Sequence, residues 1–256
     1  IPLLQRQQKH YSQNLRSNLH SHGVQLLDYE HLNDAQRQWI DEYFRKSVFP
    51  VLTPLAVDPA HPFPFVSNLS LNVAAVIRDP ETGHRQFARV KVPQKNLPRF
   101  VAIPKELSSS EPTPIHTATP LEQLIAFNLG ELFPGMTIEG HYFFRVTRDA
   151  DLELRDLEAD DLMLALEQGL RKRRVGGEVV RLEVPSEMPD NVVDMLMTGL
   201  AVEEEDLYPI DGPLGLDDLF GLIGLPLSHL KEKAHKGSTP AILARTQQHL
   251  VAEGSV

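Results

Sequence analysis

A proline-rich stretch, residues 49–65, restricts what this chain can fold into more than any other segment. Five prolines fall between Pro50 and Pro64. Each proline fixes its φ angle and lacks a backbone N–H donor, so the stretch can form neither a helix nor an interior strand of a sheet. The sequence therefore predicts a stiff, extended lead-in to the elements that follow it.

Alternating apolar residues directly after this lead-in predict a β-hairpin. Apolar side chains stand at every second position from Leu69 to Ile77, which is the period of a strand. The sequence DPETG at residues 79–83 has the chemistry of a turn. Alternation returns from Phe87 to Val92, so we expect two paired strands at the centre of the main domain.

The remaining pattern predicts helices that alternate with strands. Residues 1–22 are expected to form a helix that Gly23 ends, and Asn33 with Gln36 predicts a capping box at the start of a second helix that Pro50 ends. A third helix is predicted to begin with Thr119 as N-cap and Pro120 as the first helical residue, and to end at Pro134. Further helices are expected over residues 156–174, 192–200, 217–223 and 241–250, strands over 97–104, 141–147, 178–185 and 208–211, and an exposed loop over 107–117.

This order of elements predicts an α+β fold, in which helices pack on a mixed or antiparallel sheet. The first helix has no cap before it, so we interpret residues 1–23 as the truncated last helix of an α-helical bundle domain that precedes the main one. Residues 24–226 are expected to form the main α+β domain, and residues 227–256 a loosely ordered tail.

The bulk composition is that of an ordinary globular protein, with 41% hydrophobic and 23% charged residues. No apolar run approaches the roughly 20 residues that a membrane helix needs, and no charged-then-apolar signal pattern opens the chain. The absence of cysteine excludes disulfides and thiolate chemistry, and the net charge of −10 argues against a general nucleic-acid binder. We therefore expect a cytoplasmic protein without membrane insertion or a nucleic-acid partner.

One candidate contact surface for a polyanion or a partner subunit lies on the returning strand of the hairpin. Arg85, Arg89 and Lys91 stand at alternate positions of this strand and so share one face. That face either meets a polyanion or partner, or is the solvated side of a half-buried hairpin. The sequence leaves these two interpretations open.

A second candidate is the run of four cations Arg171, Lys172, Arg173 and Arg174. Arginine can bind phosphate through two parallel hydrogen bonds. However, the same expected helix begins with acidic residues such as Asp156, and acids at the start with bases at the end complement the helix dipole. Consecutive residues of a helix point in different directions, so the four side chains cannot all face one ligand. We therefore favour the interpretation that these cations complement the helix dipole over a phosphate site.

Other charged residues suggest no catalytic or metal site. Asp149 and Asp151 have the carboxylates that Mg²⁺ prefers, but two acids that straddle a turn usually hydrogen-bond their own backbone. The eleven histidines show none of the spacings of zinc sites. We therefore assign no catalytic, cofactor-binding or metal-binding residue.

Several long segments resemble the polyphosphate kinase family. They are FPVLTPLAVDPAHPFPFVSNLSLN, RVKVP, LPRFV, FFRVTRDADLEL, RKRRVGGEVVRLEV and YPIDGPLGLDDL, and they occur in the family's order. The resemblance covers essentially the whole chain. It implies the end of the family's amino-terminal helical domain followed by the head, or middle, domain, without the carboxy-terminal catalytic domains.

The resemblance also implies a function. Members of the family are kinases of polyphosphate biosynthesis that reversibly transfer the terminal phosphate of ATP to inorganic polyphosphate, with Mg²⁺ and a phosphohistidine, as homo-oligomers. This chain would then be a non-catalytic head-domain fragment that serves dimer assembly and shapes the polymer path. We expect it to bind no cofactor itself, to need the missing catalytic domains in cis and to be inactive alone. The alternative is a free-standing module that binds polyphosphate or nucleotide.

Overall fold

The computed structural model describes residues 2–57, 63–94, 96–109, 112–149, 177–233 and 237. The chain divides into two compact units, Ile1–Gly221 and Leu222–Val256. The first unit contains both β-sheets and all the α-helices of the described residues. The helices expected over residues 156–174 and 241–250 lie outside the described residues, and the domain limits expected at residues 23 and 226 stay predictions.

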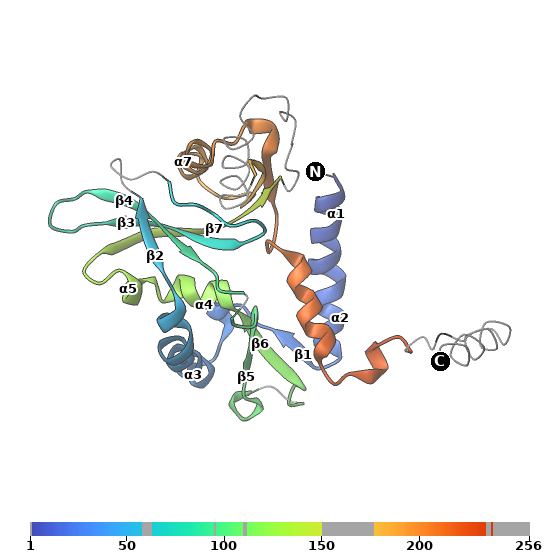
Figure 1. The fold of residues 1–256 in the computed structure, drawn as a ribbon. Helices are drawn as coiled ribbons and strands as arrows, with labels where there is room; N and C mark the ends of the chain where they lie inside the picture. Colours follow the sequence, from blue (N-terminus) through green and yellow to red (C-terminus); the bar gives the residue numbers. More distant parts are fainter. Residues whose placement is uncertain are drawn as a thin grey trace, which may run out of the picture. The chain divides into compact units, whose positions relative to one another are not determined.

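A six-stranded mixed sheet forms the centre of the first unit (Figure 1). Its strands stand in the order β2-β4-β3-β7-β8-β9, and every neighbouring pair is antiparallel except β8 and β9, which are parallel. The predicted α+β class with a mixed sheet is confirmed. The strand bounds are β2 Pro54–Val57, β3 Leu71–Arg78, β4 Arg85–Lys91, β7 Thr137–Arg148, β8 Val179–Pro185 and β9 Leu207–Ile210.

The predicted hairpin is β3 and β4, and it lies inside this sheet as expected. Its turn is held by Asp79, whose carboxylate accepts hydrogen bonds from the backbone N–H groups of Glu81 and Thr82 at 2.8 and 3.3 Å. Gly83 closes the turn with a φ of 70°, a value that suits glycine. The strand starts at Leu71 and not at Leu69, because Leu69 has a left-handed φ of 56°.

The proline-rich lead-in forms the edge strand β2 of this sheet, which pairs only with β4. Pro54 begins the strand, and an edge position tolerates proline because one side of the strand needs no donor. In the described residues of the lead-in, which leave out residues 58–62, no interior strand forms, as predicted. Ahead of β2, Pro50 lies in the short 3₁₀-helix Phe49–Val51, where it occupies the start of the helix and its missing N–H is not needed. The prediction that no helix forms in the lead-in is therefore wrong for these three residues.

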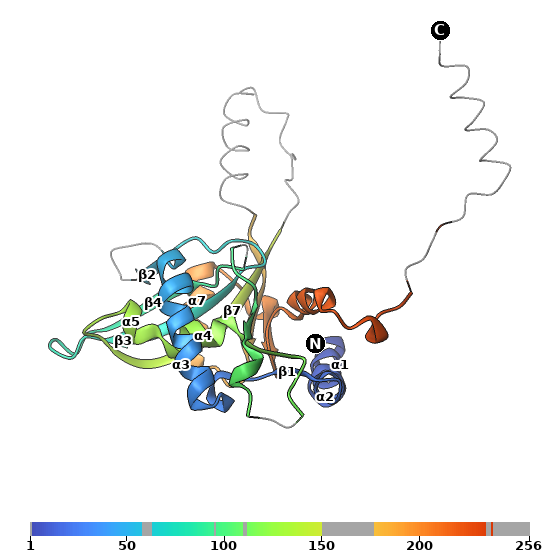
Figure 2. The same ribbon diagram turned by 90° about the horizontal axis from the view of Figure 1, so that it is seen from below.

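Both faces of the sheet are buried, which explains why β3 is buried at nearly every position. Leu71, Val73 and Ala75 point into one hydrophobic cluster, which α3 and α4 cover. Ala74 points into a second cluster on the opposite face, which α7 covers. Figure 1 shows α4 and α7 on opposite sides of the sheet, and Figure 2 shows α3 and α4 lying across their common face.

A second, three-stranded sheet was not predicted. Its order is β1-β6-β5, with bounds Val24–Leu26, His116–Pro120 and Phe100–Ile103. The predicted exposed loop at residues 107–117 therefore ends inside a strand, and the predicted N-cap Thr119 is wrong. Thr119 is fully buried and paired with Val101 in β5, and Pro120 caps the following helix without a side-chain hydrogen bond.

The helices confirm several predicted boundaries. Gly23 ends the first helical segment with a φ of 79°, and Asn33 and Gln36 form the expected capping box at 2.8 and 3.1 Å. The α-helices are α1 Pro2–His10, α2 Arg16–Ser21, α3 Asp34–Tyr43, α4 Leu121–Phe127, α5 Leu129–Leu132 and α7 Asp190–Leu200. The π-helices are η1 Tyr11–Leu15 and η3 Phe44–Val48, and the 3₁₀-helices are η2 Tyr29–His31, η4 Phe49–Val51, η5 Lys105–Leu107, η6 Glu204–Asp206, η7 Leu216–Gly224 and η8 Ser228–Leu230.

The helical segment at the start of the chain is attached to the domain by an ion pair that should make stability pH-dependent. The Arg16 guanidinium donates to the Asp28 carboxylate at 2.7 Å, and Gln123 donates to its other oxygen at 2.9 Å. Burial alone would raise the pKa of Asp28, but the hydrogen bonds from Arg16 and Gln123 outweigh it and lower the pKa. A carboxyl group with a lowered pKa stabilises the fold above its unfolded pKa of about 3.9 and loses that contribution as pH falls through the folded value.

We therefore expect the melting temperature to fall between about pH 5 and about pH 3, and to fall less in Asp28→Asn than in the unmodified chain. Thermal unfolding followed by circular dichroism at the two pH values measures this difference. An equal fall in both proteins would show that Asp28 contributes nothing to acid sensitivity.

Candidate functional site

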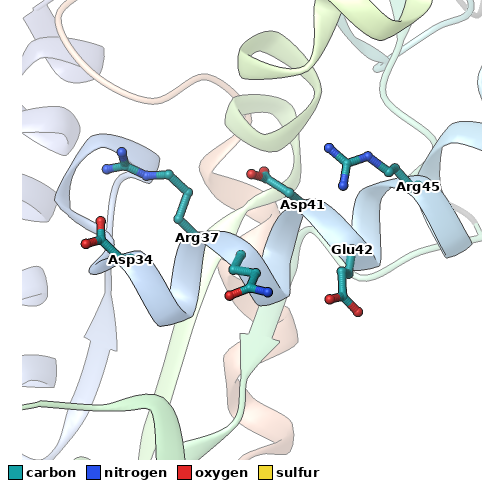
Figure 3. A pocket seen from close by; sticks show the side chains of 6 residues that line it. Asp34, Arg37, Asp41, Glu42 and Arg45 are labelled. Atoms are coloured by element: carbon teal, nitrogen blue, oxygen red, sulfur yellow. The ribbon is translucent and has the colours of Figure 1, made fainter.

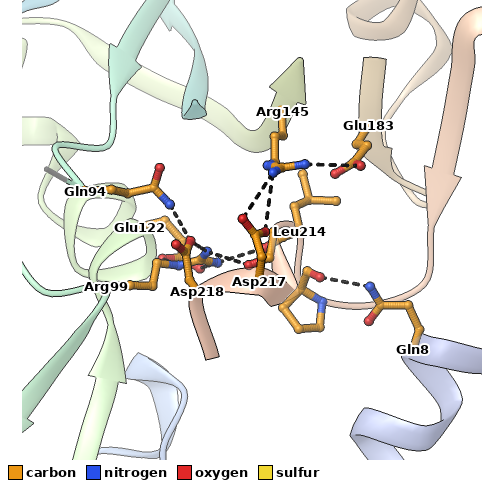
Figure 4. A network of polar contacts seen from close by, with 11 residues as sticks. Gln8, Gln94, Arg99, Glu122, Arg145, Glu183, Leu214, Asp217 and Asp218 are labelled. Atoms are coloured by element: carbon orange, nitrogen blue, oxygen red, sulfur yellow. Dashed lines mark hydrogen bonds and ion pairs between the residues drawn. The ribbon is translucent and has the colours of Figure 1, made fainter. Parts of the chain in front are cut away.

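A buried network of charged side chains lies where η7 meets the two sheets of the first unit (Figure 4). Arg99, directly before β5, is its centre, and only 6% of its side chain is exposed. Its Nε donates to the Glu122 carboxylate at 2.6 Å, and its Nη2 donates to the second oxygen of the same carboxylate. Its Nη1 donates to Asp218 at 2.6 Å and its Nη2 to the Leu214 carbonyl at 3.0 Å, so the guanidinium is surrounded by acceptors.

The surroundings of Arg99 keep it charged. Burial lowers the pKa of the guanidinium, but the charge of Glu122 and the hydrogen bonds to Glu122 and Asp218 raise it, and the net shift is upward. A buried ion pair of this kind neutralises its own charges and leaves little free charge for a ligand. The arrangement therefore favours a structural role for Arg99 and Glu122.

A second arginine of the network, Arg145 of β7, makes looser contacts. Its Nη1 lies 3.5 Å from Glu183 of β8, and its Nη2 lies 3.3 Å from Asp217. Glu183 also accepts from Arg181 at 2.6 Å. Asp217 and Asp218 are adjacent residues of η7, so each of the two arginines binds one of them, as Figure 4 shows.

The loop between β9 and η7 fits closely against these arginines. Gly215 has a φ of 64°, and a Cβ atom there would lie 3.4 Å from both Arg99 Nη1 and Arg145 Nε. On the other side, Gln8 of α1 donates to the Pro213 carbonyl at 3.0 Å. Gln8 of α1 and Arg99, which donates to the Leu214 carbonyl, therefore hold the loop, and Arg145 packs closely against it.

A hollow of about 350 Å³ on the surface of α3 is lined by charged side chains of both signs (Figure 3). Several of them already have partners: Asp41 accepts from the Tyr29 hydroxyl at 2.7 Å, and Arg45 donates to Glu131 at 2.9 Å. Burial, and then the hydrogen bond to Asp41, raise the pKa of Tyr29. Interspersed charges that pair locally are typical of a solvated helix face.

The structure places the predicted basic strand face only partly as expected. Arg85, Arg89 and Lys91 do share one face of β4, but Arg89 is buried, so the interpretation of that face as the solvated side of the hairpin is wrong for this residue. Arg89 donates to the Asn72 side chain at 2.9 Å and to the Phe65 carbonyl at 2.8 Å. Lys91 donates to the Ser67 hydroxyl at 2.9 Å. Arg89 therefore holds the end of the lead-in against the sheet, and Lys91 holds the residues that follow it.

Arg85 remains on the surface, where it pairs with Glu139 of β7 at 2.5 Å. A contact of Arg85 or Lys91 with a polyanion stays a prediction. The run Arg171, Lys172, Arg173 and Arg174 lies outside the described residues.

Replacing Arg89 with methionine should lower the free energy of unfolding by about 1–3 kcal/mol, because the buried Asn72 side-chain oxygen and the partly buried Phe65 carbonyl lose their donor. Urea denaturation measures the loss. Arg85→Gln, which removes only a surface ion pair, is the control and should lose clearly less. Equal losses in the two variants would contradict a holding role for Arg89.

The charged cluster around the end of β7 separates into different contacts. Arg145 joins the network described above, whereas Arg148 donates to the carbonyls of Val66 and Gly177 at 2.7 and 2.8 Å. Asp149 is exposed, and Asp151 lies outside the described residues. Within the described ranges, no group of three or more histidine, aspartate or glutamate side chains is placed to hold a metal ion. No helix in that part of the chain has the length and apolar character that a bilayer crossing needs.

Comparison with known proteins gives consistent matches. A family model described as the polyphosphate kinase middle domain matches residues 35–222. The chain is 78% identical over 256 residues to a polyphosphate kinase of Parasynechococcus marenigrum and 51% identical over 234 residues to one of Synechocystis sp., and it covers 36% and 32% of their lengths. It thus spans about a third of the length of each of these two relatives.

A crystal structure of polyphosphate kinase from Porphyromonas gingivalis has the same fold. It matches with a TM-score of 0.70 at 21% identity, and the match covers 91% of this chain and 33% of that one. The middle-domain model covers well over half of the sequence, so the family is established from the sequence match and the fold agrees with it. The chain belongs to the polyphosphate kinase family and contains the middle domain of that family.

Proposed function

We propose that this chain serves a polyphosphate kinase as a non-catalytic scaffold, which supports dimer assembly and shapes the path of the polymer. The observation that carries this proposal is the pairing of Arg99 with Glu122 and Asp218: the most deeply buried ion pair of the described residues binds one part of the domain to another. The matched share of the relatives, about a third of their length, is consistent with reactive groups that lie elsewhere in the whole protein.

The whole protein would then transfer the terminal phosphate of ATP to inorganic polyphosphate, with Mg²⁺ and a phosphohistidine supplied outside this chain. It would act in the cytoplasm as a homo-oligomer. These properties follow from the family and are part of the proposal. Support for the scaffold role comes from the buried Arg89 and from the fully surrounded Arg99, since neither offers its charge to an incoming substrate.

The direct test is an assay of the purified chain with ATP, Mg²⁺ and polyphosphate. We expect no transfer above background, and self-association that sedimentation velocity detects as a dimer. Measurable transfer would overturn the non-catalytic role. A strictly monomeric chain would overturn the role in assembly, provided that circular dichroism shows it to be folded.

A further inference from the structure

A small pocket on the α1 side of the six-stranded sheet has the character of an anion site. Its volume is about 230 Å³, and its lining includes Gln7, Arg145, Thr147, Arg181, Glu183 and Asp217. Sites for drug-sized ligands occupy about 300–1,000 Å³, so this pocket suits a smaller group. All of these residues belong to the first compact unit.

The register of two neighbouring strands brings the polar side chains together. Arg145 of β7 stands opposite Glu183 of β8, and Thr147 stands opposite Arg181. Residues that are directly opposite, or diagonal across one face, lie close enough for their side chains to contact a common group. Arg181 is oriented by the ring of Tyr208, which lies 4.5 Å from its guanidinium carbon.

The two arginines of this pocket share one buried counter-charge, Glu183: Arg181 Nη2 binds it at 2.6 Å, and Arg145 contacts it only loosely. Charge-assisted N–H···O bonds have lengths of about 2.7–2.9 Å, whereas Arg145 lies 3.5 Å from Glu183 and 3.3 Å from Asp217. Only 12% of the Arg145 side chain is exposed, while 63% of the Asp217 side chain is. The Nε of Arg181 is buried and has no hydrogen-bond partner among the described residues. The pocket therefore has space and hydrogen-bond donors for an acceptor that binds Arg145 more closely than Asp217 does.

We propose that this pocket binds a phosphate-sized oxyanion. Arg145 and Arg181 bind the oxygens of this anion, and the Thr147 hydroxyl donates a hydrogen bond to it. The anion and the Asp217 carboxylate compete for Arg145, so the exposed carboxylate moves into solvent. Orthophosphate and the end of a phosphate chain share this chemistry. The inference goes beyond the scaffold role, since it assigns a ligand to a site that the scaffold role does not require.

Isothermal titration calorimetry of the intact chain with orthophosphate and with tripolyphosphate tests the proposal. We expect saturable binding that weakens as salt is added. Arg145→Gln and Arg181→Gln should each lower the affinity about tenfold or more, because each removes charge-assisted hydrogen bonds. Asp217→Asn should raise the affinity about threefold to tenfold by removing the competing carboxylate. Arg45→Gln, which removes an exposed arginine outside this pocket, is the matched control and should bind like the unmodified chain.

The two ligands distinguish the source of the anion. Tripolyphosphate that binds about tenfold more tightly than orthophosphate points to the end of a phosphate chain, and equal affinities point to free phosphate. Absence of saturable binding to both ligands, unchanged affinity in Arg145→Gln and Arg181→Gln, or weaker binding by Asp217→Asn would overturn the proposal. If an arginine variant does not fold, as judged by circular dichroism, Thr147→Val and Asp217→Asn still decide: affinity must fall in the first and rise in the second.

The outcome is separable from that of the proposed function. Phosphate binding without transfer leaves the scaffold role intact and supports the site. Transfer activity without phosphate binding at this pocket overturns both proposals. In that case Arg145→Gln and Arg181→Gln should turn over ATP at the unmodified rate, which would show that the reaction uses other residues.

Discussion

Replacing Glu122 with glutamine should lower the free energy of unfolding by about 3–5 kcal/mol. The side chains of Glu122 and Arg99 are 7% and 6% exposed, so removal of the carboxylate charge leaves a buried guanidinium with an insufficient counter-charge. Asp218 remains as a partner at 2.6 Å, but its side chain is 27% exposed and bonds only one of the three guanidinium nitrogens. Urea denaturation of the purified variant measures the loss.

Two further variants separate the charge from the packing. Glu42→Gln removes an exposed ion pair between Glu42 of α3 and Lys46 of η3 and should change stability by less than about 1 kcal/mol. The double replacement of Arg99 with methionine and Glu122 with leucine removes both charges, so it should be more stable than Glu122→Gln alone. A loss below about 1 kcal/mol in Glu122→Gln would mean that Asp218 neutralises Arg99 by itself, and Asp218→Asn should then show the larger loss.

The hairpin could be predicted from the sequence because its signals are local. Alternation over Leu71 to Ile77, the turn at Asp79 and the prolines before it all act within a few residues. Burial of the second face could not be predicted, since it depends on α7, which is more than a hundred residues away along the chain. Arg89, whose strand face the sequence left open between a polyanion or partner contact and the solvated side of the hairpin, is buried for this reason.

The strand β6 was missed because local and tertiary signals disagree at its end. The residues Thr119, Pro120 and Glu122 have the spacing of a helix start, and a helix does begin at Leu121. Pairing of β6 with β1 on one side and β5 on the other extends the strand as far as Pro120. Tertiary pairing therefore moved the boundary, and Glu122 became the partner of Arg99 in place of a capping residue.

The charged network could not be derived from runs of like residues. Arg99 and Glu122 are 23 residues apart, and Arg99 and Asp218 are 119 residues apart. Each stands singly in an apolar segment, LPRFVAIP for Arg99 and TPLEQLIAF for Glu122. An isolated charge in an apolar segment of a strand or helix is the signal that was available, because such a charge has to find a partner when the segment is buried.

Replacing Phe144 with alanine should be as damaging as the loss of Glu122, with a fall of about 3–5 kcal/mol in the free energy of unfolding. Phe144 lies in β7, is fully buried and belongs to the cluster that α7 and the lead-in cover. Its removal leaves a cavity between the sheet and α7, and the surrounding strands are hydrogen-bonded on both sides and cannot collapse to fill it. Guanidinium denaturation measures the loss.

Phe220→Ala is the matched control, because the same side-chain atoms are removed at a position that is 75% exposed. It should alter stability by no more than about 0.5 kcal/mol. The contrast tests whether the side chains between the sheet and α7 form a tightly packed core. The proposed scaffold role requires such a core, because a scaffold between subunits has to be rigid. Similar small losses in both variants would show that this face is loosely packed, and the scaffold role would then have to rest on the α3 and α4 face alone.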